Sequence, residues 1–500
     1  MLLIHPPIAK PGEPPAGIAR LAGFLRANGV SCRLLDASLE GLLWLLEEPD
    51  RGEDTWTRRA ISSRADHLAA LRKPATYRSP DRYRRAVSDL NRLLNLAGRS
   101  RGAIAGLADY QERQRSPVRS ADLIQAAEQP ETSLFYPWFS RRLPELLDGV
   151  TTAGFSLNYL SQALPTFAML GYLKKEFPRL KIALGGGLVT SWLQRPDWRN
   201  PFAGLADLLV AGPGEGPLLA LAGKSATEPS PALPDFSGLP LTNYLSPGLV
   251  LPFSAASGCY WNRCSFCPER AEGNPYRPIP SGSVLDSLQT LVANTDPVLI
   301  HLLDNAVSPS LLQGLCSMPP GVPWYGFARI DRNLADPEFC HNLRRSGCVM
   351  LKLGLESGDQ DVLDRLQKGI NLNQTAKVLD NLHRAGIATY CYLLFGTPAE
   401  TEEAARRTLD FVVSHHQAIT FLNLAIFNMP IYSPDARDCE TRAFYDGDLS
   451  LYTAFRHPHG WERQKVRRFL NGEFTRQPAI AAILRNDPPI FTSNHATFFC

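Results

Sequence analysis

With 500 residues, the chain is long enough for roughly two to four domains and at least one large core. Its composition, 44% hydrophobic and 20% charged, is that of an ordinary soluble protein. The sequence contains no stretch of about 18 apolar residues, so we expect no membrane span. The net charge of +3 is too small to predict a nucleic-acid partner.

The first forty residues predict the opening of a parallel α/β sheet. Residues 2–5 form an apolar strand, residues 18–29 a helix that ends at glycine, and residues 30–38 a second strand. Strand, helix and strand with short connections are typical of α/β folds. Pro6 and Pro7 interrupt the apolar start and no basic segment precedes it, so we expect no signal peptide and a cytoplasmic protein.

Residues from about 40 to 148 interrupt this alternation of strands and helices. They are rich in arginine and in helix-forming residues, and they predict a helical insertion. Its basic character has two interpretations, a lid or docking surface and a solvated helical face. The α/β alternation then resumes with strand candidates at residues 151–160, 181–187 and 206–216.

The second half of the chain predicts a different kind of domain. Residues 225–250 are dense in Pro, Ser and Gly and predict an interdomain linker after a first domain at 1–224. Six apolar strand candidates follow, at residues 252–257, 297–303, 322–330, 348–356, 388–396 and 419–427. Their alternation with helical stretches is typical of a parallel (β/α) barrel or partial barrel, here at 251–435. We expect a mixed, largely helical extension at 436–500.

Three of the ten cysteines, Cys259, Cys264 and Cys267, lie within nine residues of each other, directly after the first barrel strand. Three thiolates can each bind one iron of a cubane cluster and leave the fourth iron open to a substrate or cofactor. Structural zinc is the main alternative, but it needs four ligands and no second Cys/His pair lies nearby. Three unligated core cysteines are the remaining alternative.

This loop resembles that of the radical S-adenosylmethionine (SAM) superfamily, in which an aromatic residue precedes the last of three cysteines. Phe266 holds that position, and the family packs the aromatic ring near the adenine of SAM. The gap between Cys259 and Cys264 contains four residues, where the family usually has three. The resemblance covers about residues 250–435. It implies a 4Fe–4S cluster, held by the three cysteines, and SAM as cofactors.

Further family motifs follow the barrel strands. Asp304 ends the second strand, Glu356 and Ser357 end the fourth, and Gly396 belongs to a Gly-x-Pro turn after the fifth. The C-terminal ends of barrel strands are where barrel active sites assemble, although each motif alone is compatible with ordinary loop chemistry. The resemblance implies that these residues contact SAM. It also implies reductive cleavage to a 5′-deoxyadenosyl radical, with flavodoxin or ferredoxin as electron donor.

The first domain resembles the cobalamin-binding, Rossmann-like domain that often precedes such barrels. The matching residues are Ser156, Gly185, Gly186 and Gly187, where small side chains at strand ends let a bulky ligand approach the backbone. None of the ten histidines has an Asp two positions before it, so the Asp-x-His motif that ligates cobalt is absent. The resemblance therefore implies cobalamin bound without a protein histidine, or a domain that has lost the cofactor.

Three functions remain open from the sequence. The first is cobalamin-dependent methylation of an unactivated carbon on a small-molecule or peptide substrate. The second is a radical SAM reaction that matures a peptide or forms a ring, with a vestigial cobalamin domain. The third is an iron–sulfur redox sensor without catalysis, which would have no need of the barrel motifs. The sequence predicts no individual catalytic residue and does not identify the substrate.

Overall fold

The computed structural model describes residues 1–47, 54–225, 232–489 and 495–500. The chain divides into two compact units. Unit 1 is built mainly from Met1–Val250 and Asp446–Ser450, and unit 2 mainly from Leu251–Tyr445 and Leu451–Asp487. Within the described residues, no helix combines the length and the apolar character needed to cross a lipid bilayer.

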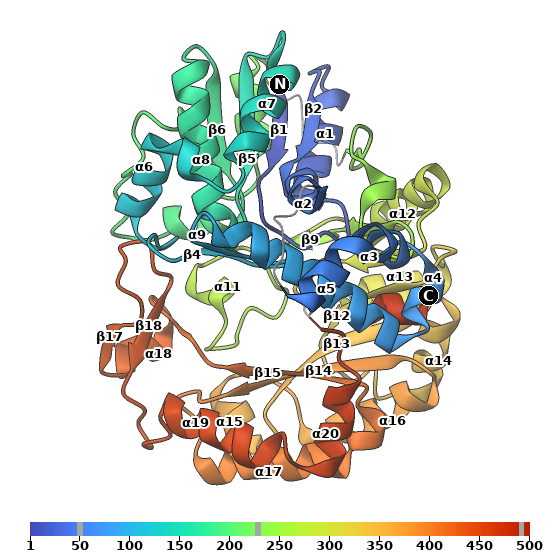
Figure 1. Ribbon diagram of the computed structural model, residues 1–500. Helices are drawn as coiled ribbons and strands as arrows, with labels where there is room; N and C mark the ends of the chain where they lie inside the picture. Colours follow the sequence, from blue (N-terminus) through green and yellow to red (C-terminus); the bar gives the residue numbers. More distant parts are fainter. Residues whose placement is uncertain (48–53, 226–231, 490–494) are drawn as a thin grey trace. The chain divides into compact units, whose positions relative to one another are not determined.

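Unit 1 contains a five-stranded parallel sheet with the strand order β2-β1-β5-β6-β7 (Figure 1). The strands are β1 (Leu2–His5), β2 (Arg33–Asp36), β5 (Thr152–Ser156), β6 (Lys181–Gly185) and β7 (Leu208–Leu209). The helices between or after them are α1 (Ala16–Ala27), α8 (Leu160–Glu176), α9 (Gly187–Leu193) and α10 (Glu215–Leu221). Because β2 and β5 lie on opposite sides of β1, the strand order reverses there, and open α/β sheets bind ligands at such a point.

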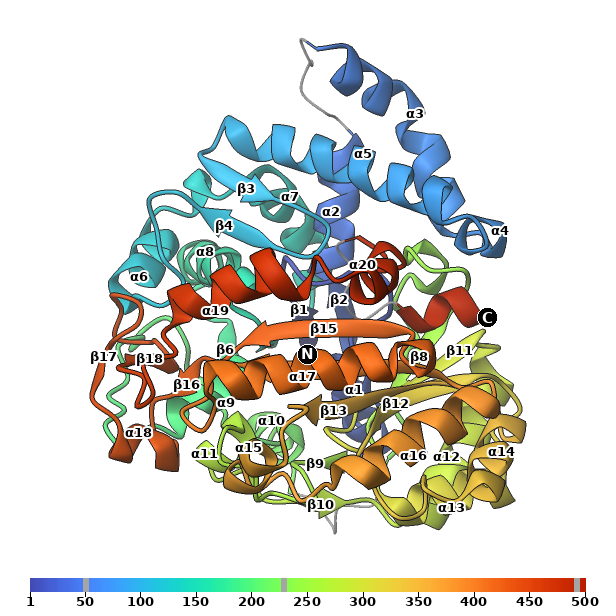
Figure 2. The same cartoon turned by 90° about the horizontal axis from the view of Figure 1, so that it is seen from below.

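The predicted helical insertion between β2 and β5 is confirmed. Its helices are α2 (Ala37–Glu47), α3 (Thr55–Leu71), α4 (Pro74–Tyr77), α5 (Pro80–Arg99), α6 (Ser120–Glu128) and α7 (Tyr136–Leu147). In α5 the apolar side chains of Tyr83, Val87, Leu90 and Leu94 recur at helical spacing and are buried, and α3 packs against α5 (Figure 2). The insertion also contains an antiparallel hairpin that the sequence did not predict, formed by β3 (Ala103–Ala105) and β4 (Tyr110–Glu112).

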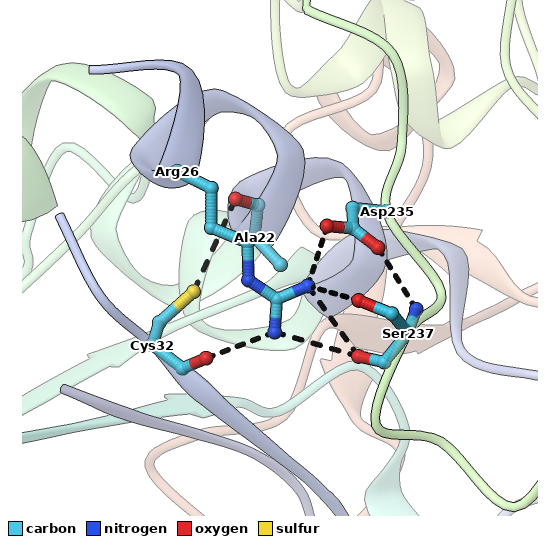
Figure 3. Close-up of polar contacts among 5 residues, drawn as sticks. All are labelled: Ala22, Arg26, Cys32, Asp235 and Ser237. Atoms are coloured by element: carbon cyan, nitrogen blue, oxygen red, sulfur yellow. Dashed lines mark hydrogen bonds and ion pairs between the residues drawn. The ribbon is translucent and has the colours of Figure 1, made fainter. Parts of the chain in front are cut away.

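The described part of the predicted linker, residues 232–250, packs on unit 1. Arg26 on α1 donates hydrogen bonds to the carboxylate of Asp235 over 2.5 Å and to the hydroxyl of Ser237 over 2.7 Å (Figure 3). Gly23 on the same helix lies so close to this segment that a Cβ would overlap its backbone. These residues therefore pack on α1 as part of unit 1. The predicted domain boundaries stay predictions.

Unit 2 contains a six-stranded sheet with the order β8-β11-β12-β13-β14-β15, in which the pairings from β11 to β15 are parallel. The strands are β8 (Val250–Phe253), β11 (Leu299–Leu302), β12 (Trp324–Ala328), β13 (Cys348–Glu356), β14 (Ala388–Phe395) and β15 (Phe421–Ile426). Each overlaps one of the six predicted apolar segments. Strands of parallel sheets covered on both faces are mostly apolar, which explains why β13 is apolar except for the buried Lys352 and the terminal Glu356. The predicted α/β class with parallel sheets is confirmed.

The remaining elements of unit 2 connect these strands or follow them. The helices between strands are α11 (Pro268–Ala271), α12 (Ser281–Thr295), α13 (Pro309–Ser317), α14 (Pro337–Arg345), α15 (Gln360–Arg365), α16 (Leu372–Arg384) and α17 (Glu402–Ser414). The short strands are β9 (Ala256–Ser257), β10 (Arg277–Pro278), β16 (Met429–Pro430), β17 (Thr441–Ala443) and β18 (Tyr452–Phe455). The C-terminal helices are α18 (Pro434–Asp438), α19 (Arg463–Phe469) and α20 (Pro478–Arg485), and the latter two pack against β15 (Figure 2).

A short part of the C-terminal region, Asp446–Ser450, belongs to unit 1. The amide of Leu449 donates to the carbonyl of Val118 over 2.9 Å. The guanidinium of Arg119 forms an ion pair with Asp446 at 2.5 Å. Unit 1 is therefore assembled from segments far apart in the sequence.

Candidate active site

The three clustered cysteines lie on the loop between β9 and α11 in unit 2. Cys264 is buried, Cys259 and Cys267 are half-buried, and all three are free thiols. The loop starts at Gly258, which has a φ of +72° and packs against a neighbouring backbone segment, so the position requires glycine. The chain thus presents three thiols on one short loop after the first strand of the sheet.

The surroundings of Cys264 and Cys267 oppose the ionisation of these two thiols in the absence of a metal. Burial raises the pKa of Cys264, although Lys368 and Arg329 act in the opposite direction, and burial raises the pKa of Cys267 to about 11. A metal cluster takes the place of the protons, so this donor set fits an iron–sulfur cluster chemically. Among the described residues, no three His, Cys, Asp or Glu side chains are arranged as a metal site. The ligand assignment therefore stays a prediction.

Glu356 ends β13 with a φ of +65°, and its carboxylate lies 2.7 Å from the ammonium of Lys368. Both side chains are largely buried. Gly354 leaves room for this pair, because a Cβ there would lie 2.5 Å from Glu356 Oε1 and from Lys368 Nζ. The same ammonium is 5.6 Å from the ring of Phe266, which packs on a small apolar cluster. The structure thus brings Phe266 and Glu356 together around one buried cation.

Ser357 and Asp304 have partners inside unit 2. The hydroxyl of Ser357 shares a hydrogen bond of 3.1 Å with that of Thr408 and accepts one from the amide of Asp359. Asp304 accepts a hydrogen bond of 3.0 Å from the amide of Ala255, and burial raises the pKa of its carboxyl to about 6. Both residues fix loops at the ends of strands, and their predicted contacts with SAM stay predictions.

The turn after β14 surrounds a buried carboxyl group. Gly396 has a φ of +77°, and its amide donates to Glu400 Oε2 over 2.5 Å. The indole of Trp461 donates to the same oxygen over 2.9 Å, and burial raises the pKa of Glu400 to about 7. Within the described residues, Glu400 Oε1 and the hydroxyl of Thr397 are buried without a hydrogen-bond partner. Such oxygens fit a polar group of a bound ligand.

The predicted cobalamin residues come together at one edge of the unit 1 sheet. Ser156 and Gly185 are paired at the C-terminal ends of β5 and β6. Asn158 donates to the hydroxyl of Ser156 over 3.0 Å and accepts from the amide of Gly187 over 2.9 Å. Gly186 has a φ of +106°, and a Cβ there would overlap the backbone that follows β5.

Large apolar side chains remain exposed at this edge. Tyr159 and Leu160 follow β5 with exposed fractions of 57% and 37%. They lie beside the point where the strand order reverses. Exposed apolar groups next to closely approachable backbone fit a large planar ligand such as the predicted cobalamin.

Two contacts of the site were not predicted from the sequence. The pairing of Lys368 with Glu356 depends on the turn after α15, twelve positions along the chain. Trp461 lies 61 positions from Glu400, and no local pattern connects them. Both contacts arise from the tertiary fold.

A family model describing the radical SAM superfamily matches residues 321–412, from just before β12 into α17. The match includes Glu356, Ser357 and Gly396. It begins after the cysteine loop.

Two curated relatives are similar over part of their length. Bacteriochlorophyllide d C-12(1)-methyltransferase of Chlorobaculum tepidum is 30% identical over 177 residues, which are 33% of this chain and 38% of that protein. The anaerobic magnesium-protoporphyrin IX monomethyl ester cyclase of Rubrivivax gelatinosus is 27% identical over 161 residues, 31% of this chain and 28% of that protein. The matched part of the chain thus spans well under half the length of these relatives.

Solved structures show the same fold at low sequence identity. TsrM of Kitasatospora setae, a radical S-adenosylmethionine methyltransferase with cobalamin and a 4Fe–4S cluster bound, has a TM-score of 0.51 and 18% identity, covering 87% of this chain and 73% of that chain. The cobalamin-dependent radical enzyme OxsB has a TM-score of 0.51 and 16% identity, covering 63% and 57%. Residues 321–412 of unit 2 thus match the model of the radical SAM superfamily, and the fold of the chain is that of these two enzymes.

Proposed function

We propose that this protein cleaves SAM reductively at a 4Fe–4S cluster held by Cys259, Cys264 and Cys267, and that it uses cobalamin to methylate an unactivated carbon. The observation that supports this most is that unit 2 combines the family match with three free thiols on one loop. Three thiolates fill three corners of a cubane and leave one iron for the cofactor.

When bound, the cluster and SAM supply a 5′-deoxyadenosyl radical, and cobalamin supplies the methyl group. The residues of the chain bind and orient these groups. The carboxylate of Glu356, fixed by Lys368, would accept hydrogen bonds from SAM. The buried oxygens of Thr397 and Glu400 would bind another polar group of the same ligand. An electron donor such as flavodoxin or ferredoxin would reduce the cluster.

Cobalamin would bind to unit 1 at the edge formed by Ser156 and residues 185–187. The exposed Tyr159 and Leu160 would be covered by the corrin, and Gly186 would allow the ligand to approach the backbone. Because the Asp-x-His motif is absent, no histidine would ligate the cobalt from this motif. The fold shared with TsrM and OxsB, both solved with cobalamin bound, supports this assignment.

A ring-forming radical reaction is the second candidate function. The similarity to the Rubrivivax protein favours it, because that protein is a cyclase. Its identity to this chain, 27%, is comparable to the 30% of the Chlorobaculum methyltransferase. In that case SAM would yield 5′-deoxyadenosine without a methylated product. In both cases we expect a small-molecule substrate.

The test is anaerobic purification, reconstitution with iron, sulfide and cobalamin, and product analysis under a strong reductant. Methylation predicts that one SAM ends as 5′-deoxyadenosine and another as S-adenosylhomocysteine. Cys264→Ala should lose the cluster and all SAM cleavage, while Cys316→Ala, which removes a cysteine on α13, should keep both. Deoxyadenosine without homocysteine product would favour the cyclase reaction. A wild-type protein that binds iron but never cleaves SAM would refute both and favour a redox sensor.

A further inference from the structure

The additional residue in the cysteine loop has a clear structural consequence. Between Cys259 and Cys264, Asn262 adopts a φ of +42°, a left-handed conformation that asparagine tolerates better than most residues. The backbone turns at this position, and the ring of the preceding Trp261 lies against Gly369.

Trp261 is held on three sides. Its indole nitrogen donates a hydrogen bond of 3.0 Å to the carbonyl of Gln367. The guanidinium carbons of Arg329 and Arg263 lie 4.0 Å and 5.0 Å from the centre of its ring, within cation–π distance. A Cβ on Gly369 would overlap the ring. The position after Lys368 therefore has to be glycine for the indole to fit.

The turn that receives Trp261 presents three successive carbonyls, at residues 366–368. The first accepts a hydrogen bond of 3.0 Å from the amide of Ser265, next to a predicted cluster ligand. The second accepts from Trp261, and the third accepts from the guanidinium of Arg329 over 2.5 Å. Gln367 has a φ of +53°, which shows that the turn adopts a rarely populated conformation to do this.

We propose that Trp261 is a positioning residue that fixes the cysteine loop on the turn at residues 366–369. Lys368 in this turn is paired with Glu356, so the same contact sets the position of the thiols relative to that carboxylate. The inference rests on the proposed function, in which the loop holds the cluster and Glu356 contacts SAM. It gives a role to the four-residue gap between Cys259 and Cys264, which is one residue longer than the usual gap in the family.

The experiment compares four variants of the full chain: Trp261→Ala, Trp261→Phe, Gly369→Ala and Gly273→Ala. Gly273 is the matched control, because its φ of +69° is close to the +66° of Gly369 but nothing lies within 4 Å of a Cβ there. The first readout is hydrogen exchange of the loop amides in iron-free protein. The second is the iron content after reconstitution and the electron paramagnetic resonance spectrum of the reduced protein, with and without SAM.

Trp261→Ala and Gly369→Ala should accelerate exchange of the Ser265 amide by at least roughly tenfold, because a hydrogen bond and a cation–π contact are lost or displaced. Trp261→Phe, which keeps a ring on Gly369, should restore part of the protection. Gly273→Ala should behave as the wild type. After reconstitution, the first two variants should hold less iron and give an altered spectrum on addition of SAM.

The two proposals fail in different ways. Equal exchange in Trp261→Ala and wild type, with an unchanged spectrum, would overturn the positioning role even in a protein that cleaves SAM. A wild-type protein that takes up no iron would overturn the proposed function, while the exchange data would still show whether Trp261 orders the loop. Equal acceleration of amide exchange in Gly369→Ala and Gly273→Ala would show that backbone strain causes the effect, and it would also overturn the inference.

Discussion

Replacement of Glu400 by glutamine tests the electrostatic argument for the turn after β14. Burial raises the pKa of this carboxyl from 4.5 to about 7, so the folded protein keeps a proton that the unfolded chain releases as the pH rises between these values. The free energy of unfolding of unit 2 should therefore fall over this window, by about 3 kcal/mol in total, and stay constant above it.

Glutamine keeps the shape of the side chain and an oxygen that accepts from Gly396 and Trp461, but it does not titrate. Glu400→Gln should therefore match the wild type at about pH 4 or below and be more stable by about 3 kcal/mol at about pH 8. The difference in the free energy of unfolding between the two proteins isolates the contribution of Glu400, because the other titrating residues contribute equally to both.

The assay is hydrogen exchange of β14 peptides in iron-free protein, corrected for the intrinsic exchange rate at each pH. Core amides report the unfolding free energy of unit 2 even if the two units unfold separately. Glu403→Gln is the control, since this carboxyl on α17 is exposed and hydrogen bonds lower its pKa, so its replacement should leave the slope of the wild-type profile unchanged between about pH 5 and pH 8. Parallel pH profiles for wild type and Glu400→Gln would refute the reasoning.

Three further predictions concern stability. Gly23→Ala should lower the melting temperature of unit 1, because the new Cβ overlaps the backbone of the segment after residue 231. The control is Gly216→Ala on α10, where a Cβ meets open space, and this change should stabilise the unit by up to about 1 kcal/mol. Lys368→Met should cost about 3 kcal/mol in denaturant unfolding, because the buried carboxylate of Glu356 loses its cation, and adding Glu356→Gln should recover part of the loss. Asp304→Asn should abolish the fall in stability that the wild-type carboxyl causes as the pH rises from 3.8 to about 6, measured by the same exchange assay.

The sheet of unit 2 could be predicted because each of its strands is a separate apolar run between helical segments. Residues 348–356 are the clearest case, since the predicted segment and β13 coincide. The hairpin β3–β4 could not be predicted, because strands of three residues show too few alternations of apolar and polar side chains. Its pairing depends on contacts within the folded insertion.

The places of the candidate site residues at strand ends were predictable, but their contacts were not. Carboxylates after parallel strands, such as Asp304 and Glu356, gather at one edge of a sheet, so the sequence indicates where they lie. The direction of a side chain is decided by its neighbours. Ser357, expected to contact the cofactor, is hydrogen-bonded to Thr408 on a helix about fifty positions later. The role of Trp261 depends on a slot at Gly369 that no local pattern reveals.

The return of residues 446–450 to unit 1 has a consequence for how such proteins can be recombined. A fragment ending at residue 250 would leave the carbonyl of Val118 without the amide of Leu449 and Arg119 without Asp446. Chimeras that exchange unit 1 between relatives therefore also need to exchange residues 446–450, with one further junction on each side of this segment.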